Sequence, residues 1–156
     1  MGDAKSLLKE WMLQFLKSRD AFFRKIAGMA DEEGGIQVNY KDGKQQRVLI
    51  MPDLSHASAS LSGSKEDQHL IIATLSNRKN KDVLAAQWKS LVEYPFLTLY
   101  FINPYSTSEK KWVLMPHVHH KVCDDSHLMH GFLSLSEMVE DITEEQIAAK
   151  GQIQLE

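Results

Sequence analysis

The stretch from Leu70 to Pro104 constrains the fold of this chain more than any other. Residues 70–75 and 96–102 are short apolar runs, which is typical of strands buried on both faces of a sheet. Between them, apolar residues at spacings of three and four predict a helix, namely Val83, Leu84, Trp88, Leu91 and Val92. Asn80 or Asp82 is expected to cap it. Two buried strands joined by one helix form a right-handed parallel crossover by strong preference. The sequence therefore predicts an α/β fold.

Length and composition limit the class of protein. The chain has 156 residues, which suits a single domain over residues 1–156 with a core of its own. Its one cysteine, Cys123, excludes an internal disulfide and favours a reducing, cytoplasmic compartment. No apolar run approaches the ~20 residues that cross a bilayer, so we expect no membrane partner. The net charge of −3 argues against broad, sequence-independent nucleic-acid binding but leaves room for a local basic groove.

The flanking segments complete a mixed sheet. Residues 4–30 predict one long amphipathic helix, whose apolar stripe, Phe22 and Phe23 included, packs on the sheet. Residues 36–40 and 45–51 predict a hairpin around Asp42-Gly43, the strongest short hairpin signal. Residues 111–115 predict a strand antiparallel to residues 96–102.

Three further segments are predicted to be less regular. Residues 54–67 are small and polar, so we expect a mobile loop. Residues 123–130 predict a short helical piece that stops at Gly131, and residues 133–139 predict a last helix. The polar tail, residues 143–156, is expected to extend that helix through Ile147 and then fray.

The order of these elements, a long helix, a hairpin, a strand, a helix and a strand, resembles the core of the restriction-endonuclease-like superfamily, also called the PD-(D/E)XK fold. Pro52-Asp53 follows the second hairpin strand, where that superfamily keeps its Pro-Asp. Residues 101–104 and Lys111-Trp112 also resemble small archaeal-type proteins of this kind. The resemblance covers roughly Lys5 to Ile102.

This resemblance implies a nuclease site in which two acidic groups hold Mg²⁺ and a lysine on the third strand activates water. Residues 72–76 of the corresponding strand carry neither an acid nor a lysine. A nuclease fold without cleavage activity, kept for nucleic-acid binding or regulation, is therefore the favoured hypothesis. The alternative is a metal-dependent nuclease with a displaced catalytic set, namely Asp53, Glu66 and Lys79.

Two other groups of residues are candidate binding sites. Arg78, Lys79 and Lys81 form a basic group near a predicted helix N-terminus, where an anion or a nucleic-acid backbone is favoured. The second group offers the nitrogen and sulfur ligands that zinc takes, and its members are His117, His119, His120, Cys123, His127 and His130. These side chains form either a zinc site, a patch that titrates near neutral pH, or an ordinary polar surface.

Three functions remain open at this point: a nucleic-acid-associated protein that does not cleave, a metal-dependent nuclease, or a small protein that binds a metal or a partner through residues 117–130. A homodimer through Phe22, Phe23 and Tyr100 is a further hypothesis. The missing acid and lysine on residues 72–76 weigh against an enzyme.

Overall fold

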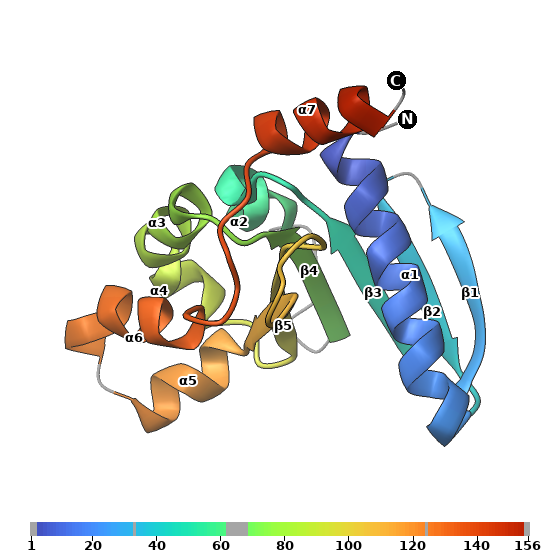
Figure 1. The fold of residues 1–156 in the computed structure, drawn as a ribbon. Helices are drawn as coiled ribbons and strands as arrows, with labels where there is room; N and C mark the ends of the chain where they lie inside the picture. Colours follow the sequence, from blue (N-terminus) through green and yellow to red (C-terminus); the bar gives the residue numbers. More distant parts are fainter. Residues whose placement is uncertain (1–2, 33, 62–68, 124, 155–156) are drawn as a thin grey trace.

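A six-stranded mixed sheet lies between two layers of helices in the computed structural model (Figure 1). The structure describes residues 3–32, 34–61, 69–123 and 125–154. Along the chain the elements are α1 (Ala4–Phe23), β1 (Ile26–Glu32), β2 (Gly35–Tyr40), β3 (Gln45–Ile50), η1 (Leu54–His56), α2 (Ala57–Leu61), β4 (His69–Leu75), α3 (Arg78–Ala86), α4 (Trp88–Leu91), β5 (Leu97–Ile102), β6 (Lys111–Leu114), α5 (Pro116–Val122), η2 (Asp125–His127), α6 (Leu128–Leu135) and α7 (Glu144–Gln154).

The strands follow one another across the sheet in chain order, from β1 to β6. The strands β1, β2 and β3 are antiparallel neighbours, β3, β4 and β5 are parallel, and β6 returns antiparallel to β5. The predicted parallel crossover is therefore confirmed, with Leu70 opposite Leu97 and Leu75 opposite Ile102. The hairpin around Asp42-Gly43 and the antiparallel strand 111–115 are confirmed as well.

Alternation along the central strands separates two cores. Ile71, Ala73 and Leu75 of β4 face α1 and α7, whereas Leu70 and Ile72 face the layer that holds α2, α3, α4 and α6. In α1, a row of buried side chains at spacings of four lies on the sheet, namely Ala4, Leu8, Met12 and Leu16. The α/β class, the mixed sheet and the long N-terminal helix are thus as predicted.

The predicted end of the first helix at residue 30 is wrong, because α1 stops at Phe23. The Asp20 carboxylate accepts hydrogen bonds from the backbone N–H of Lys25 (2.6 Å) and of Ile26 (3.0 Å), and Arg24 takes a left-handed conformation with φ of 51°. These contacts end the helix, and residues 26–32 then pair with β2 as a strand. Phe22 is consequently 86% exposed at the end of α1 instead of packing on the sheet.

The predicted mobile loop over residues 54–67 is wrong for its first half. Residues 54–61 are helical because Leu54, Ala57 and Leu61 are buried against the α3 side of the sheet and the Asp53 carboxylate caps the first turn. The rest of the predicted loop, residues 62–68, lies outside the described residues.

The helix between β4 and β5 begins earlier than predicted. Its cap is Asn77, whose side chain accepts a hydrogen bond from the backbone N–H of Asn80 at 2.9 Å, and not Asn80 or Asp82. The helix is also broken at Gln87 into α3 and α4. Trp88 nevertheless lies in the core on this side of the sheet, as its spacing predicts.

The C-terminal helices differ from the prediction. The helix α6 runs through Gly131 and ends at Leu135, so neither the stop at Gly131 nor a helix over residues 133–139 is correct. The helix α7 is separate, because Thr143 and Gln146 form reciprocal side-chain to backbone hydrogen bonds that start a new helix. Within the described part of the chain, no helix combines the length and apolar character that a membrane crossing requires.

Candidate nucleic-acid interface

The structure brings two of the predicted catalytic residues together. Lys79 Nζ lies 2.9 Å from Asp53 Oδ2, where Asp53 follows β3 and Lys79 lies in the first turn of α3. Asp53 Oδ1 also accepts hydrogen bonds from Ser55 N (2.9 Å) and Ser55 Oγ (2.6 Å). The hydrogen bonds from Ser55 and then from Lys79 hold the pKa of Asp53 well below its usual range, and the carboxylate in turn raises the pKa of Lys79. Asp53 is thus an ionised cap for the turn after β3.

A hollow of about 260 Å³ adjoins this pair and contains further carboxylates, from Asp141, Glu144 and Glu145. Among the described residues, however, no three His, Cys, Asp or Glu side chains come together in a way that could hold a metal ion. Glu66, the other acid of the predicted set, lies outside those residues. On β4, Ala73 and Leu75 are buried under α1, and so they leave no polar group there for Mg²⁺.

Each cation of the predicted basic group is paired with a carboxylate. Arg78 lies 3.1 Å from Asp82, Lys79 pairs with Asp53, and Lys81 Nζ lies 3.2 Å from Asp141 Oδ1. Lys81 is also only 4% exposed, so its ammonium does not face a ligand in solution. These side chains lie together as predicted, but their charges are largely neutralised within the protein.

Residues 123–130, predicted as one helical piece that carries zinc ligands, do not form a single helix that includes Cys123. The helix α5 ends at Val122 and Cys123 follows it in an extended conformation, while His127 closes η2 and His130 lies in α6. His117 Nδ1 lies 2.7 Å from the Val92 carbonyl oxygen. His119 packs edge-on against Trp88, with ring centroids 5.6 Å apart, and its side chain is thereby part of the packing. His120 is exposed on α5.

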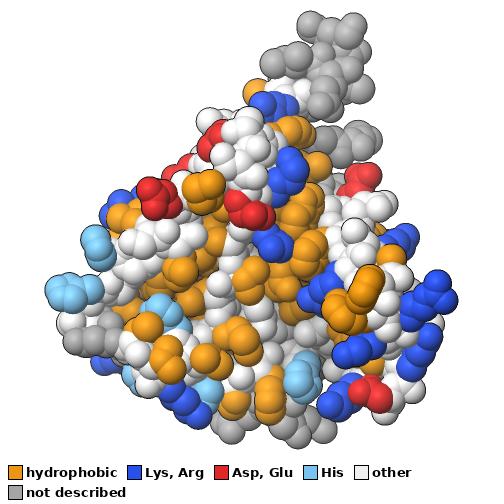
Figure 2. All heavy atoms as spheres, turned by 60° about the horizontal axis from the view of Figure 1, so that its bottom comes forward, with side chains coloured by type: hydrophobic (Ala, Val, Ile, Leu, Met, Phe, Trp, Pro, Cys, Tyr) orange, Lys and Arg blue, Asp and Glu red, His pale blue; other side chains and the backbone are white. Residues whose placement is uncertain are grey.

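Most of the cations that sequence reasoning missed lie at the opposite end of the molecule, around the end of α1 and the start of β3, and Lys111, which starts β6 opposite Ile102, extends its ammonium toward them over the Phe15 ring. We call this surface the cationic end and define it by six side chains: Arg19, Arg24, Lys25, Lys41, Lys44 and Lys111. In the part of the chain that the structure describes, none of the six is within ion-pair distance of a carboxylate. Figure 2 shows lysine and arginine side chains gathered on this side, beside a hollow lined by hydrophobic side chains. This end is therefore basic although the whole chain is acidic.

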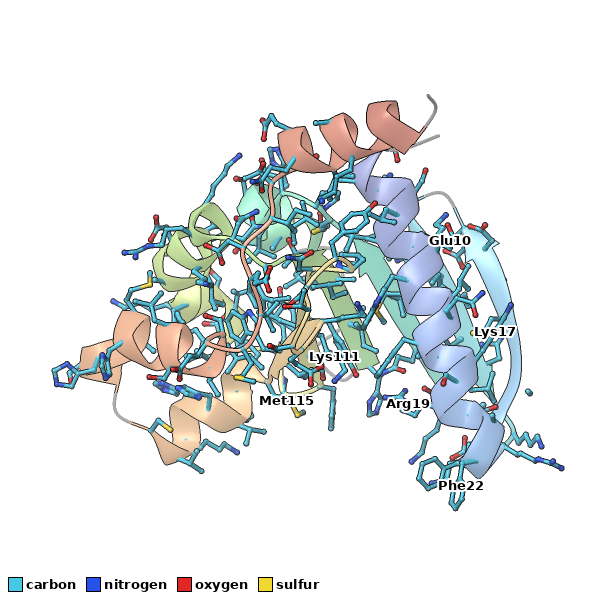
Figure 3. All side chains as sticks on the ribbon, viewed as in Figure 1. Glu10, Lys17, Arg19, Phe22, Lys111 and Met115 are labelled. Atoms are coloured by element: carbon cyan, nitrogen blue, oxygen red, sulfur yellow. The ribbon has the colours of Figure 1, made fainter. Side chains whose placement is uncertain are left out.

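Two of these cations lie over the same aromatic ring, that of Phe15. The guanidinium of Arg19 on α1 and the ammonium of Lys111 on β6 lie 5.5 Å and 5.3 Å from the centre of the Phe15 ring. Phe15 is itself stacked on Trp11 and meets the edge of Tyr100, whose hydroxyl lies 3.4 Å from Arg19 Nη1. Arg19 and Lys111 face the same space between α1 and the sheet in Figure 3.

Beside this cluster, the face of the sheet on which α1 packs is partly exposed to solvent. His69 at the start of β4 and Val113 on the edge strand β6 are exposed, and Thr98 near the start of β5 is half-buried. Two hollows of about 230 Å³ each share Tyr40 as a lining residue. One is lined by Arg19, Asp20, Phe23, Lys25, Ile26 and Tyr40, and the other by Tyr40, Asp42, Lys44, Gln45, Gln46 and His69.

Tyr40 is held in place between the two hollows. Its hydroxyl donates a hydrogen bond to Gln46 Oε1 at 2.6 Å. Burial raises the pKa of Tyr40, although the nearby Arg19 guanidinium acts in the opposite direction. Since a tyrosine ordinarily ionises near pH 10, the hydroxyl stays protonated at neutral pH and remains a donor.

A signal for this surface is present in the sequence. Trp11, Phe15, Arg19 and Phe22 recur at spacings of four, four and three, so they form one stripe beside the buried row of α1. Tyr40 belongs to the same strand face as Ile36 and Val38 by alternation. That these two features meet depends on the tilt of α1 over the sheet, which no local pattern specifies.

No family model matches the chain, and no curated protein or solved structure shows significant similarity to it.

Proposed function

We propose that this protein binds nucleic acid through its cationic end and does not cleave it. The observation that carries the proposal is the placement of charge. The predicted basic group on α3 is paired with Asp82, Asp53 and Asp141, whereas the six cations of the cationic end are free of such pairs in the described structure. Arg19, Lys25 and Lys44 line the hollows beside Tyr40 and His69 on the open sheet face, which suits a ligand that is anionic and also presents flat apolar groups.

Phosphate contacts supply most of the affinity of such a surface. Each phosphate that a lysine or arginine neutralises releases condensed counterions, so binding weakens as salt rises. For about three to five phosphate contacts we expect the logarithm of the association constant to fall with the logarithm of the salt concentration at a slope of roughly −2 to −4. The acidic remainder of the chain confines binding to this end.

The surroundings of Asp53 support the part of the proposal that excludes cleavage. In the nuclease superfamily that the predicted order of elements resembles, the acid after the hairpin holds a metal ion. Here both oxygens of Asp53 accept hydrogen bonds, from Ser55 and from Lys79. A restriction-endonuclease-like fold that has kept binding and lost hydrolysis is consistent with this arrangement, and the fold relationship stays part of the proposal.

Fluorescence anisotropy of labelled 30-nucleotide DNA and RNA, single-stranded and duplex, tests the proposal. We expect Arg19→Glu combined with Lys111→Glu to weaken binding at least tenfold at about 50 mM salt, since two attractive charges become repulsive. The matched control is Lys17→Glu, which lies two residues from Arg19 and so about 200° around the helix. Figure 3 shows Lys17 and Arg19 on opposite sides of α1. The control is expected to bind within twofold of the unmodified protein.

Three results would overturn the proposal. The first is no binding to any of the four probes, and the second is an equal loss in the Lys17 control. The third is tighter binding to anionic phosphatidylserine vesicles than to any nucleic acid, because exposed Phe22 and Phe23 among cations also suit a membrane surface. Arg78→Glu should leave binding within twofold, which separates the cationic end from the predicted basic group. Labelled probes incubated with Mg²⁺ should stay intact.

A further inference from the structure

We infer that the paired hollows at Tyr40 are a binding site for unpaired nucleotides, with a base seated between Tyr40 and His69 and the adjoining backbone phosphates along Arg19 and Lys25. This inference rests on the proposed function and makes it more specific, because it names single-stranded nucleic acid as the preferred ligand. It is carried by the shape and the chemistry of the two hollows, one aromatic and polar, the other cationic.

The first hollow offers aromatic faces that are already fixed. The His69 ring lies against Phe96, with centroids 4.5 Å apart and planes 27° apart, and the Tyr40 hydroxyl is held by Gln46. Both His69 and Tyr40 line the hollow. Base stacking on such side chains is tolerant of sequence because every base has a flat face. Rings that are positioned before binding lose little conformational freedom when a base arrives.

Polar groups around the same hollow suit the edge of a base. The Tyr40 hydroxyl directs its proton to Gln46 Oε1, so the amide nitrogen of Gln46 is the end of that side chain that Tyr40 does not use. Gln45 and Lys44 line the hollow from the start of β3. The Asp42 carboxylate accepts a hydrogen bond from Lys44 N at 2.9 Å, which fixes the turn that carries them. An amide and an ammonium together offer donors to the carbonyl and ring-nitrogen acceptors of a base.

The second hollow supplies charge next to the base site. It shares Tyr40 with the first and is lined by Arg19 and Lys25. Lys25 Nζ lies 5.6 Å from the centre of the Phe23 ring, and the Asp20 carboxylate is engaged by backbone N–H groups after α1. A phosphate that follows a seated base therefore meets cations, and the nearby carboxylate already has two donors of its own.

This arrangement favours single strands over duplexes. A duplex presents its phosphates to a flat surface while its bases stay paired and stacked, so only the charges contribute. Seating one base of a duplex in the hollow requires unpairing and unstacking it, whereas a single strand offers both phosphates and base faces at once. We therefore expect single-stranded DNA or RNA to bind at least fivefold more tightly than a duplex of the same sequence at about 150 mM salt.

The test compares His69→Ala and Tyr40→Leu with the unmodified protein on single-stranded and duplex probes. Each change should weaken single-strand binding about fivefold or more, and should leave duplex binding and its salt slope unchanged. His69 is exposed and its replacement leaves the core intact, so this variant remains informative if Tyr40→Leu unfolds. Tyr40→Phe keeps the ring and should bind single strands within twofold. The matched control is Tyr105→Leu, a half-buried tyrosine that lines a different hollow.

The outcomes separate this inference from the proposed function. Binding of single strands and duplexes with equal affinity, or unchanged single-strand binding by His69→Ala, overturns the inference and leaves nucleic-acid binding intact. Loss of both single-strand and duplex binding in His69→Ala also overturns it, since the residue would then act on the whole surface. Absence of binding to every probe overturns the proposed function together with it.

Discussion

Asn80 is the side chain whose loss we expect to destabilise this protein most clearly. It is 1% exposed at the start of α3, and the two N–H groups of its amide are shared among three acceptors, Leu75 O (2.8 Å), Pro52 O (2.9 Å) and Thr74 Oγ1 (3.1 Å). Its amide oxygen accepts a hydrogen bond from Leu54 N at 3.0 Å. One side chain thus ties together the end of β4 and the connection that follows β3.

Asn80→Ala removes all of these bonds and leaves buried backbone groups without partners. A buried hydrogen bond contributes about 1 kcal/mol, and an orphaned donor or acceptor costs about 1–3 kcal/mol. With at least one N–H and one carbonyl orphaned, we expect the free energy of unfolding to fall by roughly 3–5 kcal/mol and Tm by roughly 8–15 °C. Asn80→Asp keeps the shape but places an acceptor against two carbonyl oxygens, so it should be at least as damaging at pH 7.

Urea denaturation followed by circular dichroism measures these changes. Lys89→Ala, an exposed position on the adjacent helix α4, is the control and should change the free energy of unfolding by less than about 0.5 kcal/mol. A loss below about 1 kcal/mol in Asn80→Ala would refute the reasoning, because the buried backbone groups would then have found other partners.

Three further changes test the packing and the charges. Trp88→Ala, in the core against Phe132, should lower the free energy of unfolding by roughly 3–5 kcal/mol in thermal or urea melts, and an unchanged melt would contradict its placement. Asp53→Ala should cost about 1 kcal/mol at pH 7 through the lost cap. The pKa of Asp53 is lower in the folded than in the unfolded chain, so the stability that its carboxylate contributes is present above the usual pKa near 3.8 and shrinks as the pH falls. The free energies of unfolding of the wild type and of Asp53→Ala should therefore converge toward pH 2. A difference that stays constant with pH would count against the cap. Lys81→Met should lower the free energy of unfolding less than Lys81→Ala does, because the methionine side chain keeps most of the packing of the buried lysine stem. Equal losses in the two variants would assign the effect to the ion pair with Asp141.

The central α/β unit was predictable because its signals are local and strong. The apolar runs at 70–75 and 96–102 contain too few polar residues to be half-exposed strands. The spacing of Trp88 from the other apolar residues predicts which face of its helix is buried. The strand β1 was not predictable in this way. Residues 26–30 include two alanines and a methionine, which favour a helix locally, and pairing with β2 is what makes the segment a strand.

The candidate site was predictable in part. Asp53 and Lys79 are 26 residues apart and do meet, because one follows the predicted hairpin and the other follows the neighbouring predicted strand. Asn80 was predicted as a helix cap but is a buried amide that bonds several backbone groups. The sequence alone does not distinguish an asparagine that caps a helix from one that is buried beside it. Arg19, Tyr40 and Lys111 come from three distant elements, and their association appears only once α1 is placed across the sheet.

Residues 139–143, between α6 and α7, cross the carboxyl ends of β4 and β5. Asn77 donates to the Ile142 carbonyl oxygen (2.9 Å), Asn103 donates to that of Glu140 (2.8 Å), and Ile142 N donates to Ser76 O (2.9 Å). In open α/β sheets this edge is where ligands usually bind. Here residues 139–143 cross that edge with their own backbone, and the hollow that remains beside Asp53 is lined by the carboxylates of Asp141, Glu144 and Glu145, so an anionic ligand is better sought at the amino ends of the parallel strands.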